Sequence, residues 1–462
     1  MADKTLSKTA PILIVGAGVF GLSTALHLGQ RGYKNVTVID KQDYDKTLYS
    51  YDNGYINKVL RCAYGADTIY TNLALSAREV FLEWNAELSN SGSSPPLSLT
   101  SKNTMYVNCS TLSMINREEE LPPFERQSLD YLKSIGKSDS QFIVNNAEDI
   151  ARAGKAGFGQ CVDPFNRKSR GLPHGGLLDT LGGLVYADKS CLFAMHKAKP
   201  GAEEQDTVAG VRTANGVEHL AALTIVAGGG WTPTTVPELD NLCETTAGSV
   251  VSYRIPRSSP LWDRFAPEKF PSYQIGMRDG AEGGVYGFPR DLNGIVKIGY
   301  RGTKYTNPIV QGDGKERSTP ITRWTAGTTL TAIPSTALRV IKTFVAKNLP
   351  ELNEHNIPIV KSRLCWYNDS FDNHLVVDRV PSRKNLMVAT GGSGHGFTYL
   401  PVLGKWIVDI IEGKELVGAD KEIKKRWQWR SLPDGEKAYN VIMQAVKGRE
   451  HWQGRCLLRM RS

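Results

Sequence analysis

A short apolar run followed by three spaced glycines constrains this chain more than any other stretch. Residues 12–15 (Ile-Leu-Ile-Val) have the length and branching of a buried parallel strand, and Gly16, Gly18 and Gly21 follow at once. Glycine at these positions permits a sharp turn, a close approach of the backbone to a pyrophosphate, and tight packing of the next helix on the strand. A strand-to-helix turn that binds no nucleotide can show the same glycines. Further features of the sequence must therefore distinguish a nucleotide site from such a turn.

Two such signals surround the glycines. A helix follows the glycines, and free N–H groups at the start of a helix face phosphates. A second strand, residues 36–39, is followed by Asp40 and Lys41, about twenty residues beyond the glycines, where a carboxylate can bind the hydroxyls of an adenosine ribose. Together these features predict a site for an adenine dinucleotide.

Length and composition indicate a soluble globular protein of more than one core. With 462 residues, we expect two domains or one interleaved pair. The apolar content is 40% and the charged content 22%, and no stretch approaches the ~18 apolar residues of a membrane span. The first residues lack the apolar core of a secretory signal. We expect a cytoplasmic protein with no membrane partner, and leave a peroxisomal location open, although the C-terminus shows no clear signal for one.

Metal and nucleic-acid binding are both disfavoured. The seven cysteines are odd in number and form no C-x-x-C pair, and the eight histidines form no H-x-x-x-H pattern. We therefore expect neither a disulfide framework nor a metal site. The net charge is +9, but the basic residues are scattered among acids, and their densest cluster, within residues 421–430, is short. A protein that holds anionic small molecules explains this charge as well.

Helical patterns alternate with strands along the remaining chain. Two further strands run into glycine turns: residues 224–231, with Gly228 and Trp231, and residues 385–397, with Gly392, Gly394, His395, Gly396 and Phe397. Period-2 alternation from about residue 248 to 302 predicts an antiparallel sheet. Helices are predicted at residues 68–88, 182–199, 335–348 and 402–411.

Three glycine turns on separate strands suit an extended FAD better than NAD. We predict an α/β plus antiparallel β fold, in which the antiparallel sheet is set between stretches of a Rossmann-like FAD-binding domain and is assigned to a substrate domain. The expected FAD-binding domain comprises residues 10–85, 180–245 and 350–430, the substrate domain residues 86–179 and 246–349, and the C-terminal tail residues 431–462.

Several motifs occur together in this order: Ile14-Val-Gly-Ala-Gly18, Asn57-Lys-Val-Leu-Arg-Cys-Ala-Tyr-Gly65, Val226-Ala-Gly-Gly-Gly-Trp231, Tyr286-Gly-Phe-Pro289, Lys297-Ile-Gly-Tyr300, Leu364-Cys-Trp366 and Gly392-Ser-Gly-His-Gly-Phe-Thr-Tyr-Leu-Pro401. With them, roughly residues 10–415 resemble the monomeric sarcosine oxidase family of FAD-dependent amine oxidases. The likeness is to its fungal branch of fructosyl amino acid oxidases (amadoriases), saccharopine oxidases and pipecolate oxidases. The resemblance implies an FAD-binding domain of the glutathione-reductase type that is interleaved with a mixed-sheet substrate domain.

The resemblance implies FAD attached through a thioether to Cys365, at the end of a plausible strand and with Asp378 as a neighbour. Without the motif, a buried free cysteine would be the better interpretation. The resemblance also implies that Lys297 lies above the flavin ring, where a fixed cation stabilises the anion formed when reduced flavin passes an electron to oxygen. From the residues alone, Lys297 is either solvated at a sheet edge or aimed into the cleft.

Further roles follow from the same resemblance. Lys58 and Arg61 lie three apart and reach one site if their segment is helical. In sarcosine oxidase the Arg61 position helps to hold the substrate carboxylate, whereas the fructosyl enzymes keep the lysine and lack the arginine. Arg61 therefore favours the saccharopine and sarcosine type; an ordinary surface ion pair is the alternative. His395 either contacts the flavin or is a hydrogen-bonding turn residue. The implied cofactor contacts are Gly16, Gly18, Val19, Phe20, Gly21, Asp40, Lys41, Asn57, Lys58, Gly228, Trp231, Cys365, Asp378, Gly392, Gly394, His395, Gly396, Phe397 and Thr398, and the implied catalytic residues are Lys297, Arg61, Lys58 and Thr398.

Two departures from the family pattern matter. Relatives carry a lysine that binds substrate carboxylate where this chain has Thr398. Residues 198–208 offer no strand, although the family has a strand pair there that contacts the adenine, so the adenine contacts are left open.

The resemblance implies an oxidase of secondary or substituted amines, which transfers hydride to flavin N5, yields an imine and reduces O2 to H2O2. We assign no general base and expect a monomer or weak homodimer. Fructosyl amino acid oxidase and saccharopine or pipecolate oxidase are alternatives within the class. Outside it, the alternatives are a flavoprotein dehydrogenase, a non-catalytic flavin-binding protein and an NAD dehydrogenase.

Overall fold

The computed structural model describes residues 6–41, 57–90, 99–115, 120–198, 210–277, 279–322, 332–381 and 383–432. One half of the molecule is built on a five-stranded sheet in the order β19-β20-β11-β1-β2. The inner pairings are parallel, and β19 joins the edge antiparallel to β20. The bounds are β1 Ile12–Val15, β2 Val36–Ile39, β11 Leu223–Val226, β19 Val376–Arg379 and β20 Leu386–Thr390. The three strands predicted to run into glycine turns are β1, β11 and β20.

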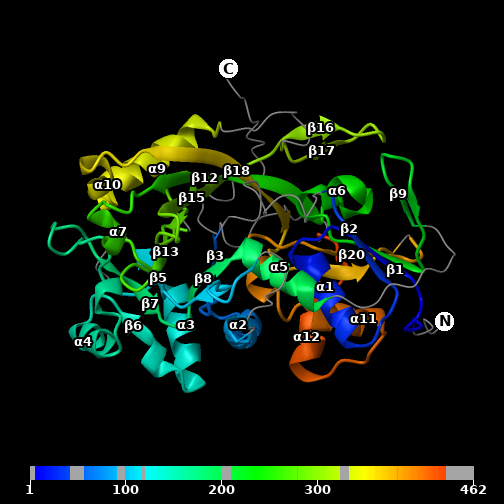
Figure 1. The fold of residues 1–462 in the computed structure, drawn as a ribbon, viewed down its shortest axis with the longest axis horizontal. Helices are drawn as coiled ribbons and strands as arrows, with labels where there is room; N and C mark the ends of the chain where they lie inside the picture. The colour runs from blue at the N-terminus through cyan, green and yellow to red at the C-terminus, as the bar shows by residue number, and fades with distance from the viewer. Residues whose placement is uncertain are drawn as a thin grey trace.

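Helices cover this sheet (Figure 1). Helix α1 packs on α5 and α11, and α11 packs on α12. All four contribute to the hydrophobic core of this half, which includes the fully buried Trp427. The bounds are α1 Val19–Gln30, α2 Thr68–Ser89, α5 Ala187–Lys197, α11 Gly404–Ile411 and α12 Gly418–Trp427.

The other half is built on an eight-stranded mixed sheet in the order β18-β12-β15-β14-β13-β5-β7-β6. Only the β5–β13 pair is parallel among its described pairings. A second core lies against it, with α9 among its contributors. The bounds are β5 Thr111–Ile115, β6 Gln141–Ile143, β7 Gly175–Asp179, β12 Cys243–Arg254, β13 Ser272–Ile275, β14 Val285–Gly287, β15 Ile295–Tyr305, β18 Ile359–Ser370 and α9 Ser335–Asn348.

A small three-stranded sheet, in the order β3-β8-β4, accompanies the two large ones. Its bounds are β3 Asn57–Leu60, β4 Tyr106–Val107 and β8 Gly183–Tyr186. The prediction of a helix from residue 182 is wrong for its first five residues, because β8 precedes α5. A Cβ on Gly183 would lie 2.2 Å from the carbonyl oxygen of Val107, so glycine serves close strand pairing here.

The expected domain boundary at residue 350 also differs from the structure. Strand β18 pairs with β12 along its length and therefore belongs to the eight-stranded sheet. The chain returns to the five-stranded sheet only with β19. The passage before residue 210 that was expected to lack a strand lies largely outside the described residues, but a short hairpin, β9 Val211–Arg212 with β10 Glu218–His219, follows it.

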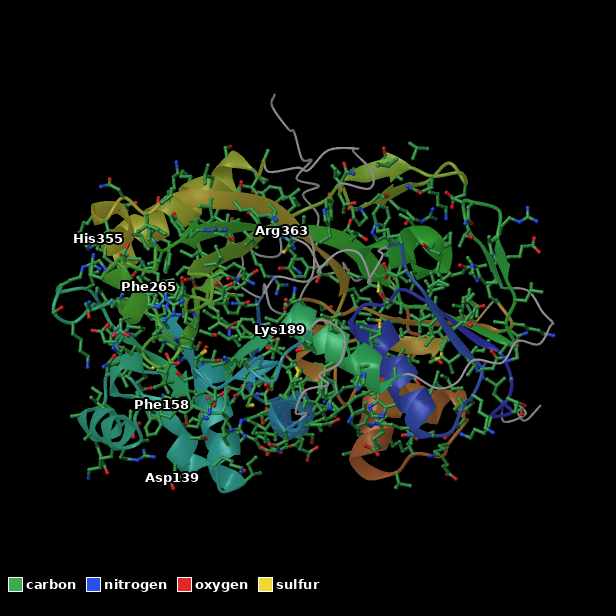
Figure 2. All side chains as sticks on the ribbon, in the orientation of Figure 1. Asp139, Phe158, Lys189, Phe265, His355 and Arg363 are labelled. Atoms are coloured by element: carbon green, nitrogen blue, oxygen red, sulfur yellow. The ribbon has the colours of Figure 1, made fainter. Side chains whose placement is uncertain are left out.

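Short elements complete the described fold, and side chains fill the space between the layers (Figure 2). They are α3 Pro123–Ser134, α4 Ala147–Lys155, α6 Thr232–Thr235, α7 Leu261–Arg264, α10 Pro350–Glu354, β16 Pro308–Val310 and β17 Glu316–Ser318. No helix in these described ranges has the length and apolar character needed to cross a membrane.

Candidate active site

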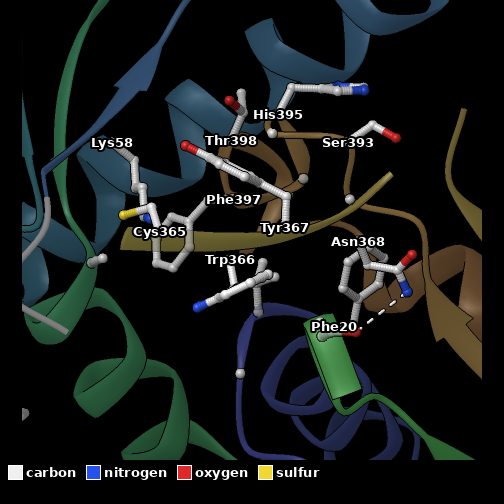
Figure 3. A pocket seen from close by; sticks show the side chains of 18 of the residues that line it. Phe20, Lys58, Cys365, Trp366, Tyr367, Asn368, Ser393, His395, Phe397 and Thr398 are labelled. Carbon is white, nitrogen blue, oxygen red and sulfur yellow. Dashed lines mark hydrogen bonds between the residues drawn. The ribbon is translucent and has the colours of Figure 1, made fainter. Parts of the chain in front are cut away.

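A cavity of about 370 Å³ is lined by residues of both halves of the molecule. Its walls come from the turn after β1, from β3, β15 and β18, and from the glycine turns that follow β11 and β20. The close-up in Figure 3 shows several of these side chains. The cavity therefore joins the predicted nucleotide site to the predicted redox residues.

The turn after β1 has the geometry that its sequence predicts. Gly16 has φ +110°, and a Cβ there would lie 2.5 Å from the carbonyl oxygen of Ala227. A Cβ on Gly21 would lie 1.8 Å from Gly16 O, so this glycine allows α1 to pack on β1. A Cβ on Gly18 would meet nothing within 4 Å, and Gly18 lines the cavity. The three glycines thus separate into a turn, a packing contact and an open approach for a ligand.

Asp40 and Lys41 lie beside this turn and line the cavity. The amide of Ala17 donates a 2.7 Å hydrogen bond to Asp40 Oδ2, which ties the end of β2 to the glycine turn. Lys41 Nζ lies 3.7 Å from the centre of the Trp231 ring. Burial lowers the pKa of Lys41 to about 8, against the opposing charge of Asp40.

The two later glycine turns line the same cavity. Gly228 and Trp231 come from the turn after β11, and the residues from Gly392 to Thr398 come from the turn after β20. Phe20 at the start of α1 packs under the second turn, 3.3 Å from the place of a Cβ on Gly392. The sequence prediction that these distant turns serve one site is consistent with this arrangement.

Cys365 lies in the middle of β18, not at the end of a strand as expected, and it points into the cavity (Figure 3). Gly248 is its partner on β12, so no side chain faces it there. Burial opposes ionisation of the thiol, but the charges of Arg363, Lys58 and Lys297 outweigh burial and lower the pKa of Cys365. Cys191 also lines the cavity, yet burial raises its pKa to about 12.

Lys297 lies on β15 inside the sheet, and its side chain is 4% exposed. Of the two alternatives left by the sequence, the structure supports the cleft. Its ammonium donates to the carbonyl oxygen of Asn57 and lies 4.1 Å from the centre of the Phe288 ring. Burial, and after it the charge of Lys58, lowers the pKa of Lys297 well below its usual value. An anion brought to the cavity would favour its protonated form.

Lys58 and Arg61 are not on a helix: Lys58 is on β3, and Arg61 follows that strand. Both nevertheless line the cavity. Arg61 Nη1 donates a 3.2 Å hydrogen bond to Gln274 Oε1, and the guanidinium lies 4.5 Å from the centre of the Tyr64 ring. Burial lowers the pKa of Lys58. The two cations are brought together by the strand and the turn after it.

Thr398 and His395 come from the last glycine turn and are both buried. Thr398 Oγ1 donates to the carbonyl oxygen of Val59 across 3.4 Å. His395 Nε2 lies 3.0 Å from the carbonyl oxygen of Asn373, and its Nδ1 lies 3.3 Å from the hydroxyl of Tyr399. Burial lowers the pKa of His395 to about 3, so the imidazole is neutral. Its bonds support the turn-residue interpretation, and it also lines the cavity.

Asp378 and Gly21 are predicted contacts that do not belong to the described lining of the cavity. Asp378 lies on β19 and accepts a 2.7 Å hydrogen bond from the amide of Trp429 and a 2.8 Å one from the amide of Arg379. Asp378 therefore anchors the chain after α12. Gly21 serves the packing of α1.

Among the lining residues that the sequence analysis did not assign to the site are four with polar side chains: Tyr286, Arg301, Arg363 and Tyr367. Three of them lie at even spacing from recognised residues, on the same strand. Arg301 is four residues after Lys297, and Arg363 and Tyr367 flank Cys365 by two. Alternate strand residues share a face, so this spacing was the available signal. Arg363 lies near the middle of the molecule (Figure 2).

The cavity suits FAD on structural grounds. One part is a glycine cradle beside Asp40, and another holds Lys58, Lys297 and the activated thiol of Cys365. The first part suits the pyrophosphate and ribose of a dinucleotide, and the cations of the second suit a flavin, which gains negative charge on reduction. Within the described residues no group of three or more His, Cys, Asp or Glu side chains could hold a metal. The arrangement is that of a flavin-dependent oxidoreductase.

Comparison with known proteins identifies the family. The chain belongs to the FAD dependent oxidoreductase family, which it matches over residues 11–410. It is 24% identical to L-saccharopine oxidase of Schizosaccharomyces pombe over 94% of this chain and 96% of that protein. It is 26% identical to human peroxisomal sarcosine oxidase over 54% of this chain and 63% of that protein. The fold is that of fructosyl peptide oxidase from E. terrenum, with a TM-score of 0.71 at 22% identity over 94% of this chain and 97% of that one.

Proposed function

We propose that this protein is an FAD-dependent oxidase of secondary or substituted amines, with FAD attached through Cys365. The observation that carries the proposal is the convergence of Cys365, Lys58 and Lys297 in one cavity with the glycine turn of β1. Saccharopine and sarcosine, the compounds in the names of two relatives, are secondary amines, which favours this substrate class.

Bound FAD would supply the two-electron oxidation of a C–H bond next to nitrogen and the reduction of O2 to H2O2. Attachment would replace one C–H hydrogen of the flavin by the sulfur of Cys365, and the two electrons released would pass to the flavin and from it to O2. The part of Cys365 is to give up its thiol proton, and the neighbouring cations favour that loss. Lys297 presents Nζ to the cavity from inside the sheet. As negative charge develops there, protonation of Nζ becomes favourable, and the ammonium stabilises that charge without moving.

Residues around β3 would orient the substrate. Arg61 is held by Gln274 and Tyr64 and presents a positive charge to the cavity. Thr398 is neutral, and its hydroxyl is directed to the backbone of Val59. No residue is assigned as a general base, since a neutral amine can lose hydride without one.

The test is a panel of amines with two readouts. The oxidised flavin spectrum should bleach when a substrate is added without oxygen, and H2O2 should appear in stoichiometric amounts in air. Bleaching without peroxide would indicate a dehydrogenase instead. A flavin spectrum that no amine changes would contradict the proposed function.

A further inference from the structure

Arg301 is a buried cation whose hydrogen-bonding edge is open. It lies on β15, is 9% exposed and lines the cavity. Its Nε and Nη2 atoms are buried and have no hydrogen-bond partner in the part of the chain that the structure describes. The contact that holds the guanidinium is the ring of Tyr367, 4.6 Å from Arg301 Cζ. A buried charged donor without an acceptor raises the free energy of the folded protein. A ligand that accepts hydrogen bonds from these two atoms would remove that cost.

Neighbouring charges do not fill that edge. Three other cavity cations each donate to the chain: Lys297 to Asn57 O, Arg61 to Gln274 Oε1 and Arg363 to Cys365 Sγ. Burial opposes ionisation of Asp369, but the charges of Lys304 and Arg301 lower its pKa. Its Oδ1 has no hydrogen-bond partner among the described residues, so it does not accept from Arg301. Its Oδ2 accepts from Lys304 and from Thr246, so its ion pair is with Lys304.

The backbone around Arg301 makes room for a guanidinium. Gly394 has φ +78°, and a Cβ there would lie 2.2 Å from Arg301 Nη1. A Cβ on Gly248 would lie 3.4 Å from Arg301 Cγ. The pairing of β12 with β15 shifts register at Gly248, between the pairs Ala247–Tyr305 and Ser249–Tyr300. Irregularities of this kind re-aim side chains next to active sites.

The open edge has the form that holds carboxylates elsewhere in this chain. Arg317 binds Asp240 through Nε and Nη2, both at 2.7 Å. Arg430 binds Asp372 through the same two atoms, at 2.7 and 2.6 Å. These are the side-on, two-bond pairs that arginine forms with planar anions. In Arg301 the same two donors have no acceptor among the residues that the structure describes.

We propose that Arg301 binds a carboxylate of the amine substrate side-on through Nε and Nη2, and so determines specificity for acidic amines. That the bound carboxylate belongs to a substrate rests on the proposed function, whereas binding of an anion at Arg301 depends only on the cavity. It places the substrate carboxylate on β15, at a residue other than Thr398 and Arg61. The substrate is then an amine whose carboxylate reaches Arg301 while its reacting carbon lies by the flavin.

The test uses the flavin-loaded enzyme and a ligand that cannot be oxidised. Propionate and its neutral analogue propionamide are titrated against the flavin absorption spectrum. Truncating one partner of a buried charge pair weakens binding by about 30-fold or more. Arg301→Gln should therefore lower the affinity for propionate by that factor and leave the affinity for propionamide unchanged. Arg301→Lys should keep part of the affinity for propionate, because lysine keeps the positive charge but cannot form the side-on pair of hydrogen bonds. Flavin content and melting temperature verify that each variant folds.

Arg339→Gln is the matched control, since it removes an exposed arginine of the same half that pairs with Glu282. It should bind propionate as the unchanged enzyme does. Equal propionate binding in Arg301→Gln would overturn the proposal, as would an equal loss for propionamide. If Arg301→Gln altered the flavin spectrum but left the affinity for propionate unchanged, Nε and Nη2 of Arg301 would be assigned to the cofactor. That result would also overturn the proposal. The titration needs no turnover, so an enzyme that binds propionate through Arg301 but oxidises no amine contradicts the amine-oxidase function alone.

Discussion

Arg363 Nη2 donates a hydrogen bond to Cys365 Sγ across 3.5 Å. The two residues are two apart on β18, so both side chains project from the same face of the strand. An arginine remains protonated at every physiological pH, and its charge is the largest contribution that lowers the pKa of this thiol. Strand periodicity therefore turns a buried cysteine into a thiol prepared for reaction.

The first prediction is covalent flavin on Cys365. Acid precipitation of the unchanged protein should leave the yellow chromophore in the pellet, and Cys365→Ala should release it to the supernatant. Cys191→Ala is the control, because Cys191 lines the same cavity but burial raises its pKa to about 12. Flavin in the supernatant of the unchanged protein would refute the linkage.

The second prediction concerns the pH dependence of the thiol. Removing the charge in Arg363→Met should raise the pKa of Cys365, so a smaller fraction is thiolate at a given pH. Iodoacetamide labelling of flavin-free protein, located by mass spectrometry, should then rise through its midpoint at a higher pH than in the unchanged chain. Coincident midpoints would mean that Arg363 does not activate the thiol.

The third prediction tests Lys297. Lys297→Met should slow reoxidation of the reduced flavin by about a hundredfold or more and leave anaerobic reduction by substrate closer to normal, because one preorganised charge is worth roughly 3 kcal/mol. Stopped-flow absorbance separates the two half-reactions. Lys269→Met removes an exposed charge that pairs with Asp263 and should change neither rate. Normal reoxidation in Lys297→Met would leave the lysine with a structural role.

Local sequence patterns predicted the parts of this fold that depend on neighbouring residues. The spacing of Gly16, Gly18 and Gly21 was enough to predict the turn, the open approach and the packing contact. Long helices such as α9 were predicted from the helical repeat of their apolar residues. The short run from Gly183 to Tyr186 was misassigned, because four apolar residues fit a strand or a helix equally.

Contacts between distant segments could not be predicted from pattern. Lys297 on β15 donates to Asn57 on β3, 240 residues away, and only the folded chain brings these two residues together. The importance of Arg301 likewise depends on which acids reach it, which only the packed structure shows. The hydrogen bond of Asp378 to Trp429 could not be predicted for the same reason, since Trp429 comes from a segment beyond α12.

The fourth prediction is a loss of stability in acid caused by His395. Its pKa is about 3 in the folded protein and 6.5 ordinarily, so the unfolded chain binds a proton that the folded chain does not. The contribution of this residue is therefore complete above about pH 6.5 and falls by up to about 1.4 kcal/mol per pH unit on acidification towards pH 3. Urea unfolding of His395→Asn should show a flatter acid limb. An acid limb as steep as that of the unchanged protein would contradict the neutral, buried imidazole.

The last prediction concerns Thr398 and the substrate. A buried carboxylate needs cationic partners, since an uncompensated ion in a dry site costs several kcal/mol. Thr398 has one hydroxyl proton, and that proton is donated to Val59 O across 3.4 Å. We therefore expect sarcosine, pipecolate and fructosyl-glycine to be poor substrates, and the natural substrate to be a larger amine whose carboxylate lies away from Thr398, within reach of Arg301.

The measurement compares turnover of each amino acid with that of its amide, in the unchanged enzyme and in Thr398→Lys. The lysine should lower KM for the free amino acids by about tenfold or more and leave the amides unaffected, because it supplies the charge that threonine lacks. Thr398→Ser is the matched control, since it keeps the hydroxyl and should reproduce the unchanged enzyme. Efficient oxidation of a free amino acid by the unchanged enzyme, with no gain in Thr398→Lys, would show that substrate choice is set by other residues of the cavity.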